Sequence, residues 1–383
     1  MKRTFFVALF LCMLSCSLYA QYKYEFTDVK RNPATSVKNQ AATGTCWCFG
    51  TTSFIESEII RLSGGKIGPE DIDLSEMFTV RCNYIERTKD NYIRNGKGNV
   101  GPGSITHMTI NVMKKYGCVP EEVYHGICYY SPNGLHNHGN LSKWIKEISA
   151  LAVEKHEGYP EKIYNAVLDS YLGEYPANFT YKGKKYTPKS FMESTKINLD
   201  DYVEITSFTH HPFYERVPLE VPDNWDHQLV YNLPLDEFMA VIDNAINMGS
   251  TVAWDGDLTD TGYDFYKEIS LNTSFDLKHT AQIEKRIVED KVTQENRQYR
   301  FETFQLVDDH IEHIVGIAKD QEGVKYYITK NSWGAGKTSS QYNARNDSGY
   351  HYMSEEYVKG NTICYVVHKD CIPKAIRTKL GIK

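Results

Sequence analysis

Side chains in the first two thirds of the chain follow the spacing of helices. In the run from Cys46 to Leu62, four positions fall about one turn apart: Phe49, Ser53, Glu56 and Ile60. This spacing predicts a helix, and the following Gly64-Gly65 pair is a typical helix end. Similar patterns predict helices that begin near Ser75 and that cover Ile105–Tyr116, Leu141–Glu154, Glu161–Leu172 and Leu235–Met248.

The last third of the chain has a different pattern, in which short β-type runs alternate with turns. We expect strands at Thr251–Trp254, at Leu306-Val307 with Ile311–Ala318, and at Val324–Thr329. The pattern of residue types also changes between residues 131 and 224, where candidate helices are followed by polar and aromatic segments. Helices early and strands late predict an α+β architecture.

Composition and charge narrow the class of protein. The 383 residues are 41% hydrophobic and 24% charged, which is typical of a globular chain rather than a disordered one. The formal net charge is -6, and the 43 basic residues are well mixed with 49 acidic ones. Because no block or stripe of Lys and Arg is present, we expect no binding to nucleic acid.

The first twenty residues have the pattern of a signal peptide. Lys2 and Arg3 precede the apolar run Phe5–Leu14, and Leu18–Ala20 forms a tolerable cleavage site. We therefore expect residues 1–20 to be removed and the protein to be exported to the periplasm or the extracellular space. Lipid attachment at Cys16 is less favoured, because the residues before it match a lipobox poorly. No later run is long enough to span a membrane, so we expect no membrane association after cleavage.

Signal cleavage would leave seven cysteines, which is an odd number. One reactive thiol with up to three disulfides fits this number, and so do seven free thiols. The seven are Cys46, Cys48, Cys82, Cys118, Cys128, Cys364 and Cys371.

Cys46 lies where a loop of small residues meets the first predicted helix. The positive end of a helix stabilises a thiolate, and free N–H groups in its first turn can donate to an oxyanion. Gly44 lets other backbone approach, and Gln40 supplies a side-chain amide that could complete an oxyanion hole. The alternative is that a cysteine beside Trp47 is only a small buried hydrophobic residue.

A catalytic thiol needs a base, and the base needs a group that orients it. His310 follows Asp309 at the start of a predicted strand, and Asn331 comes immediately after the next one. Neighbouring strands would let Asn331 reach the imidazole of His310, with Trp333 shielding the contact from water. His313 would lie on the other side of the same strand, and spacing alone does not choose between the two histidines.

Two other candidates for metal or redox chemistry have simpler explanations. Cys48 is two residues from Cys46, so on a helix it points about 200° away and is expected to pack in the core. His210 and His211 precede a proline and show no third ligand at an evident spacing. We therefore expect neither a metal nor a cofactor.

Three sequence blocks resemble those of papain-like cysteine peptidases. They are Gln40 followed after five residues by Cys46-Trp47, Asp309-His310 followed at +6 by Gly316, and Lys330-Asn331-Ser332-Trp333-Gly334. The resemblance implies a papain-like fold with a helical half and an antiparallel, β-barrel-like half. It also implies Cys46 as nucleophile, His310 as general acid and base, Asn331 as its orienting group and Gln40 as oxyanion donor. Trp47 and Trp333 would support them, and the Asp-His pair favours His310 over His313.

The spacing between the blocks is similar to that of one branch of that family. His310 lies 264 positions after Cys46, well beyond the roughly 130–150 typical of papain and cathepsins. Residues 21–383 would then form one peptidase domain with an inserted helical subdomain at about 131–224. Leu74-Ser75-Glu76, Tyr231–Leu235 and Val252–Trp254 are similar to segments of the bleomycin hydrolase/aminopeptidase C branch.

The branch implies a peptide substrate and an aminopeptidase that removes N-terminal residues. An endopeptidase is the alternative, and a non-catalytic peptide-binding protein of the same fold is a further one. Family resemblance alone also implies a homo-oligomer, such as a hexamer.

Overall fold

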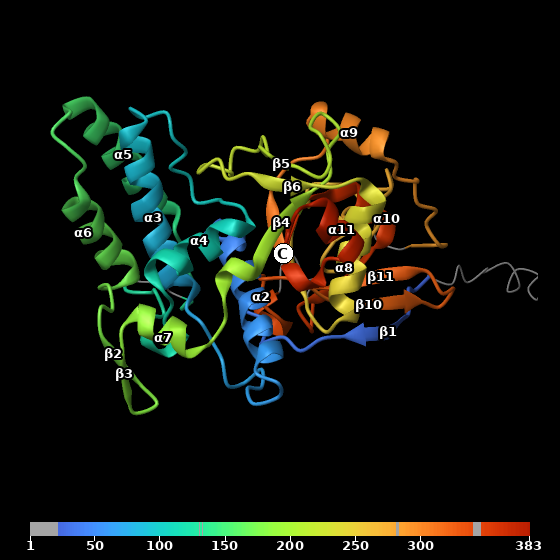
Figure 1. The fold of residues 1–383 in the computed structure, drawn as a ribbon, viewed down its shortest axis with the longest axis horizontal. Helices are drawn as coiled ribbons and strands as arrows, with labels where there is room; N and C mark the ends of the chain where they lie inside the picture. Colours follow the sequence, from blue (N-terminus) through green and yellow to red (C-terminus); the bar gives the residue numbers. More distant parts are fainter. Residues whose placement is uncertain (1–21, 130, 132, 281–282, 340–345) are drawn as a thin grey trace, which may run out of the picture.

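The computed structural model describes residues 22–129, 131, 133–280, 283–339 and 346–383. The expected signal peptide therefore lies outside the described residues. Figure 1 shows a helical part beside a part built on a large sheet, with helix α2 (Cys46–Leu62) between them. This is the α+β arrangement that the pattern predicted.

The helical part matches the predicted segments closely. Ser75 caps α3 by accepting a hydrogen bond from the backbone N–H of Phe78, so α3 begins directly after it. Gly117, with φ +85°, ends α4 because few other residues adopt that backbone conformation. The helices of this part are α3 (Glu76–Ile93), α4 (Thr106–Tyr116), α5 (Gly139–Lys155), α6 (Glu161–Leu172) and α7 (Pro188–Ser194).

Most of the strands join into one twisted mixed sheet. Its order is β5-β6-β4-β13-β7-β10-β11-β12-β9-β8, and β1 pairs with β10. The strands are β1 (Phe26–Arg31), β4 (Tyr202–Thr206), β5 (Arg216–Val217), β6 (Val230–Asn232), β7 (Val252–Gly256), β8 (Tyr263–Asp264), β9 (Ile269–Ser270), β10 (His310–Asp320), β11 (Lys325–Lys330), β12 (Tyr350–Ser354) and β13 (Thr362–His368).

Both faces of the central strands are covered by helices. Trp254 of β7 and Tyr365 of β13 pack against α8 (Leu235–Asn247), whereas Ala253 and Val366, the next residues along, pack against α2. Such alternation follows from the two-residue period of a strand. The sheet is therefore held between two helices, and α2 faces the first residues of β10.

The sheet is more open than the expected barrel-like half. Most of its pairs are antiparallel, but β4 pairs with β6 and β12 with β9 in parallel. Within the described residues the strand path ends at β5 on one side and at β8 on the other. The short strands at the two ends of the sheet follow long loops. Their pairing therefore depends on tertiary contacts that the local pattern does not contain.

The segment from 131 to 224 packs closely on both parts of the molecule. Its helices α5 and α6 share a core with α3 and with Trp47, and β4 joins the main sheet beside β13. It also contains the hairpin of β2 (Phe179–Tyr181) and β3 (Lys184–Tyr186). That this segment is an insertion remains a prediction.

The end of the chain is part of the core on the α8 side. Ile376 and Leu380 of the last turns are buried with α8, and Lys379 bonds to Glu237 of that helix. The late helices are α9 (Gln294–Glu302), α10 (Glu355–Asn361) and α11 (Lys374–Lys379). Among the described residues, no helix is long and apolar enough to cross a membrane.

Candidate active site

Cys46 is the first residue of α2, as predicted, and it is partly exposed. Close packing brings it to the start of β10, because Gly50, one turn further along α2, lies against Ile311. A Cβ on Gly50 would be 2.8 Å from Cγ2 and 3.0 Å from the carbonyl oxygen of Ile311. The backbone of Ile311, the neighbour of His310, in turn lies close enough to the Cys46 thiol to lower its pKa.

His310, Glu312 and Asn331 share one face of the sheet. His310 and Glu312 are two residues apart on β10, so their side chains point the same way. The antiparallel register pairs His313 with Lys330, which places Asn331 opposite Glu312 at the end where β10 begins. His310 Nε2 lies 3.0 Å from Asn331 Oδ1 and 3.8 Å from Glu312 Oε1.

A chain of hydrogen bonds determines which nitrogen of His310 carries the proton. A carboxylate only accepts, so Tyr263 donates its O–H to Glu312 over 3.0 Å. The Tyr263 oxygen then accepts from Asn331 Nδ2 at 2.9 Å. Asn331 therefore presents its oxygen to His310, which must donate from Nε2. Nδ1 of His310 is thus the basic nitrogen.

His313, the rival candidate, lies on the opposite face of β10. Its Nδ1 is 2.8 Å from Ser53 Oγ of α2, and it is completely buried. Burial, with the nearby Lys330 ammonium, lowers the pKa of His313 well below its ordinary value. A neutral histidine inside the α2–β10 interface has a packing role.

Gln40 is held against the block that contains Asn331. Ser332 donates its hydroxyl to Gln40 Oε1 over 2.6 Å, and the backbone N–H of Gln40 donates to the carbonyl oxygen of Ser332 over 2.8 Å. Because the side-chain oxygen is used in this way, the amide NH₂ group points to the other side, where it can donate to a developing oxyanion.

Burial keeps both reactive groups neutral in the resting protein. The pKa of Cys46 is raised to about 12, mainly because the thiol is removed from water. The backbone of Ile311 lowers this pKa, whereas the nearby Asp308 raises it. Burial also lowers the pKa of His310, although Glu312 and the hydrogen bond with Asn331 oppose this. A neutral imidazole can accept a proton from a neutral thiol, which is what general-base catalysis requires.

Each member of this pair has a tryptophan as a neighbour, Trp47 next to Cys46 in the chain and Trp333 against His310. Trp47 is fully buried and donates its indole N–H to the carbonyl oxygen of Pro102 over 2.9 Å. The Trp333 ring lies 4.9 Å from the His310 ring, between centroids, where it covers the histidine. Cys48 is buried and donates to the carbonyl oxygen of Glu76, so its predicted core position is confirmed.

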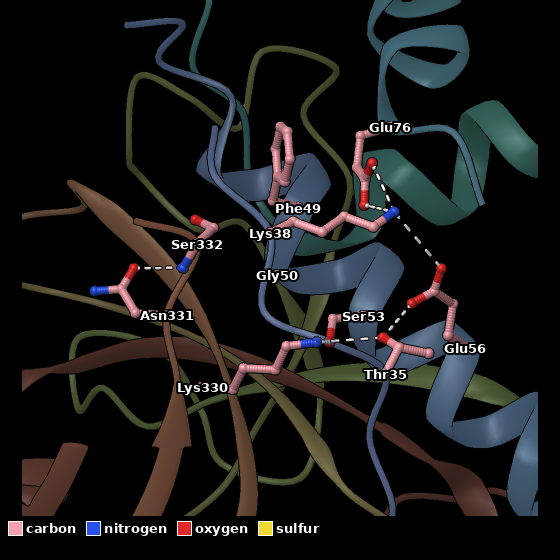
Figure 2. A pocket seen from close by; sticks show the side chains of 10 residues that line it. All are labelled: Thr35, Lys38, Phe49, Gly50, Ser53, Glu56, Glu76, Lys330, Asn331 and Ser332. Atoms are coloured by element: carbon pink, nitrogen blue, oxygen red, sulfur yellow. Dashed lines mark hydrogen bonds and ion pairs between the residues drawn. The ribbon is translucent and has the colours of Figure 1, made fainter. Parts of the chain in front are cut away.

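A small internal cavity of about 10 Å³ lies behind the site, and Figure 2 shows its lining. Lys330, which precedes Asn331, donates to Ser53 of α2 over 2.7 Å and to Thr35 over 3.2 Å. Thr35 donates in turn to Glu56, also on α2. These bonds attach the end of β11 to α2, and so they fix Asn331 relative to Cys46.

Every described cysteine is a free thiol. His210 is exposed and His211 is partly buried, and both have a carboxylate neighbour, since Glu220 contacts their Nε2 atoms at 3.1 and 2.6 Å. Sequence spacing missed this third group because it comes from the other side of a loop. The three side chains form a group that could hold a metal ion.

Sequence reasoning also missed Glu312, Tyr263, His351 and Ser332. Glu312 could have been noticed, because it is an acidic residue two positions after His310 in an apolar strand. Tyr263 and His351 carry no such signal. They reach Glu312 from separate short strands, and His351 Nε2 bonds to it over 2.7 Å.

The geometry defines a class of enzyme. A thiol at a helix N-terminus, an oriented imidazole and a fixed amide are the groups that acyl transfer by a cysteine nucleophile requires. The profile of the Peptidase C1-like family matches residues 99–382, about three quarters of the chain, which include His310 and Asn331. The chain therefore belongs to this peptidase family.

Similar proteins agree with this assignment. Aminopeptidase G of Lactobacillus delbrueckii subsp. lactis is 24% identical over 89% of this chain and 83% of its own. Aminopeptidase C of Streptococcus thermophilus is 24% identical over 87% and 80%. The crystal structure of PepW from Lactobacillus rhamnosis covers 93% of this chain and 84% of its own, with a TM-score of 0.69 at 19% identity, so it shows the fold.

Proposed function

We propose that this protein is a cysteine aminopeptidase in which Cys46 is the nucleophile. The observation that carries the proposal is the pair of His310 and Asn331, whose side chains are 3.0 Å apart. The pair lies at the start of β10, against which α2 packs, and Cys46 is the first residue of α2. The relatives named aminopeptidase support removal of N-terminal residues in particular.

The mechanism follows from the groups present. Cys46 attacks the peptide carbonyl carbon while its proton passes to Nδ1 of His310, and the Gln40 amide donates to the oxyanion. The imidazolium then protonates the leaving amine as the thioester forms. Water deprotonated by His310 releases the acid and restores the thiol. Asn331 keeps the ring in one orientation throughout.

The test compares two substrates that differ only at the amine. Leucyl-aminomethylcoumarin has a free amine, and its N-acetyl form has a blocked one. We expect wild type to cleave the first at least tenfold faster and Cys46→Ala to cleave neither; Cys128→Ala, at an exposed thiol, is the control. Activity retained by Cys46→Ala would exclude this nucleophile, and faster cleavage of the blocked substrate would favour an endopeptidase.

We also propose that the enzyme is exported. The support is the sequence pattern of residues 1–20, which have a basic start, an apolar run and a small residue at position 20. Fractionation of the producing cells followed by N-terminal sequencing should find the protein outside the cytoplasm and beginning at Gln21. Recovery in the cytoplasm with the first twenty residues attached would contradict this.

A further inference from the structure

Two neighbouring histidines and a glutamate from a second loop converge at the surface of the molecule. Nε2 of His210 is 3.1 Å from Glu220 Oε2, and Nε2 of His211 is 2.6 Å from Glu220 Oε1. One ligand atom from each of the three residues lies within 4.8 Å of the other two. Two imidazoles and a carboxylate are ligands that zinc and similar divalent cations prefer. The third ligand, which sequence spacing did not supply, is thus present in the fold.

The separations between these atoms are close to those around a bound ion. Two ligand atoms that each lie about 2.1 Å from a tetrahedral zinc ion are about 3.4 Å from one another. The contacts of Glu220 with His210 and His211 are shorter than this, so an ion between them would move the atoms apart by less than about 1 Å. Glu220 is exposed, and its side chain can move by that amount.

The backbone that carries the two histidines is fixed by Asn232 of β6. Asn232 is completely buried, and its side-chain oxygen accepts the backbone N–H of Phe208 at 2.9 Å. Its amide donates to the carbonyl oxygens of Phe208 and His211, at 2.8 and 3.2 Å. In the turn held in this way the two imidazole rings lie 4.3 Å apart, between centroids. Their ligand atoms are therefore in place before an ion binds, which lowers the entropic cost of binding.

Helix α9 fixes the ring of His210 from the other side. Phe301 stacks on this ring, with 5.7 Å between centroids and 13° between the planes. Gln298 accepts the backbone N–H of Thr209 through Oε1 at 2.6 Å, so its Nε2 faces His210 and donates to Nδ1 over 2.9 Å. In the ion-free protein, His210 therefore carries its proton on Nε2 and donates to Glu220.

The surroundings of the group favour a cation and leave it accessible. His210 and Glu220 form part of the wall of a pocket of about 660 Å³, which also contains the exposed Glu302. The described residues that line this pocket include no Lys or Arg. Three protein ligands leave a fourth position of a tetrahedral ion open, as in zinc sites that exchange water or a ligand.

We propose that His210, His211 and Glu220 bind one divalent transition-metal ion of the zinc class, with a fourth coordination position that opens into this pocket. The ion joins the loop between β4 and β5 to the loop between β5 and β6. When it binds, the proton of His210 moves from Nε2 to Nδ1, and the Gln298 amide, which donates there, must turn away. The inference does not depend on the proposed peptidase function.

The experiment titrates ZnCl₂ into the full chain and measures affinity and stoichiometry by calorimetry. The parent protein carries Cys46→Ala and Cys128→Ala, because these two thiols are not buried and would compete for zinc. We expect one ion per chain. Loss of an outer partner of a ligand costs about 10- to 100-fold in affinity, so His211→Asn, which removes a ligand, should cost at least about 100-fold. His279→Asn, at an exposed His–Asp pair, is the control and should bind as the parent does.

Gln298→Glu tests the proton shift at His210. A carboxylate at position 298 can still accept the N–H of Thr209 and can also accept the new Nδ1–H of His210. Such a partner strengthens a metal-binding histidine, so the affinity for zinc should rise about tenfold. A group that is only hydrogen-bonded would bind no ion and would gain none from this change.

Two kinds of result would overturn the site. The first is that the parent binds no zinc, or binds it as tightly in His211→Asn. The second is an unchanged or lower affinity in Gln298→Glu, because His210 would then not coordinate through Nε2. Thermal unfolding in EDTA checks that each variant is folded. If His211→Asn unfolds at a lower temperature than the parent, Glu220→Gln takes its place and should show a loss of affinity as well.

Discussion

At the scale of single residues, the reactivity of Cys46 depends on groups far from it in the chain. Glu312 is one of them: through Tyr263 and Asn331 it determines that His310 carries its proton on Nε2. It also opposes the effect of burial on the pKa of His310, whereas His351, which bonds to Glu312, lowers that pKa. Glu312 is therefore a positioning residue.

The pH profile tests this role. His310 acts as a base when neutral, and its pKa is lowered below 6.5, so the acid limb of kcat/KM should lie below pH 6.5. Glu312→Gln removes a group that raises this pKa, so the limb should move further down, by about one pH unit. The amide introduced at position 312 can also donate a hydrogen bond, so Tyr263 and Asn331 lose their single orientation. His310 would then carry its proton on either nitrogen, and kcat should fall.

Glu322→Gln, at an exposed position, is the control and should leave the profile unchanged. If Glu312→Gln shows the wild-type limb and kcat, Glu312 has no influence on His310. A shift of the acid limb of kcat/KM to higher pH would mean that Glu312 lowers the pKa of His310 rather than raising it.

The proposed catalytic residues illustrate what local sequence contains at this scale. Cys46, His310 and Asn331 stand in continuous blocks, so a pattern of a few residues indicates each of them. Glu312 and Asp308 lie beside His310 but become informative only when neighbours are known. Their partners Tyr263 and Asp255 come from other strands, and no spacing rule links them to the site.

At the scale of elements, α4 and β4 are joined by a buried ion pair that also contacts the loop between β5 and β6. His107 of α4 contacts Glu204 of β4 through Nδ1 at 2.6 Å, and Asp226 through Nε2 at 2.8 Å. Burial lowers the pKa of His107, but the two carboxylates outweigh it and raise the pKa to about 10.

Replacing His107 by Gln should destabilise the fold by about 3 kcal/mol near pH 6, because it leaves a buried carboxylate unpaired. The folded pKa is above the ordinary 6.5, so this stability is fully present below pH 6.5 and is lost as the pH rises through about 10. Denaturant unfolding should therefore show a smaller difference in the free energy of unfolding between wild type and His107→Gln at pH 10 than at pH 6.

The matched control is His279→Gln, whose exposed pair with Asp276 should contribute little to stability because water screens it. If His107→Gln is as stable as wild type at pH 6, the pair does not hold α4 to β4. A difference that grows with pH would contradict the raised pKa.

Elements differ in how well a local pattern predicts them. Amphipathic helices such as α6 were predicted to the residue, because their spacing is contained in the helix itself. The hairpin of β2 and β3 was missed, because its two-residue turn, Lys182-Gly183, needs positive φ at both positions but has a residue that favours it only at Gly183. Two-residue strands such as β8 exist only through their pairing partners.

At the scale of the whole molecule, catalysis depends on how tightly α2 packs against the sheet. Cys46 is on α2 and His310 on β10, so the two meet only if the helix and the strand keep their spacing. Gly50 permits that spacing, because its missing Cβ leaves room for Ile311.

Gly50→Ala should therefore lower kcat/KM by at least tenfold and stability by about 1–3 kcal/mol, the usual effect of overpacking. Activity should fall even at temperatures where the variant is fully folded, because the start of β10 moves away from Cys46. Kinetics and thermal unfolding of the same sample measure both effects.

Gly139→Ala at the exposed start of α5 is the control, since a Cβ there meets only the Asn137 side chain, at 3.3 Å. Wild-type kinetics in Gly50→Ala would mean that the α2–β10 spacing does not control the site.

The most direct test of Cys46 as the nucleophile is to alkylate the protein with iodoacetamide in stages and to map each modified cysteine by mass spectrometry. We expect the loss of peptidase activity to follow the modification of Cys46 one for one. Exposed Cys128 should also react, but without effect on activity, and the buried thiols should react slowly. Full activity after complete modification of Cys46, or inactivation that follows another cysteine, would contradict the account.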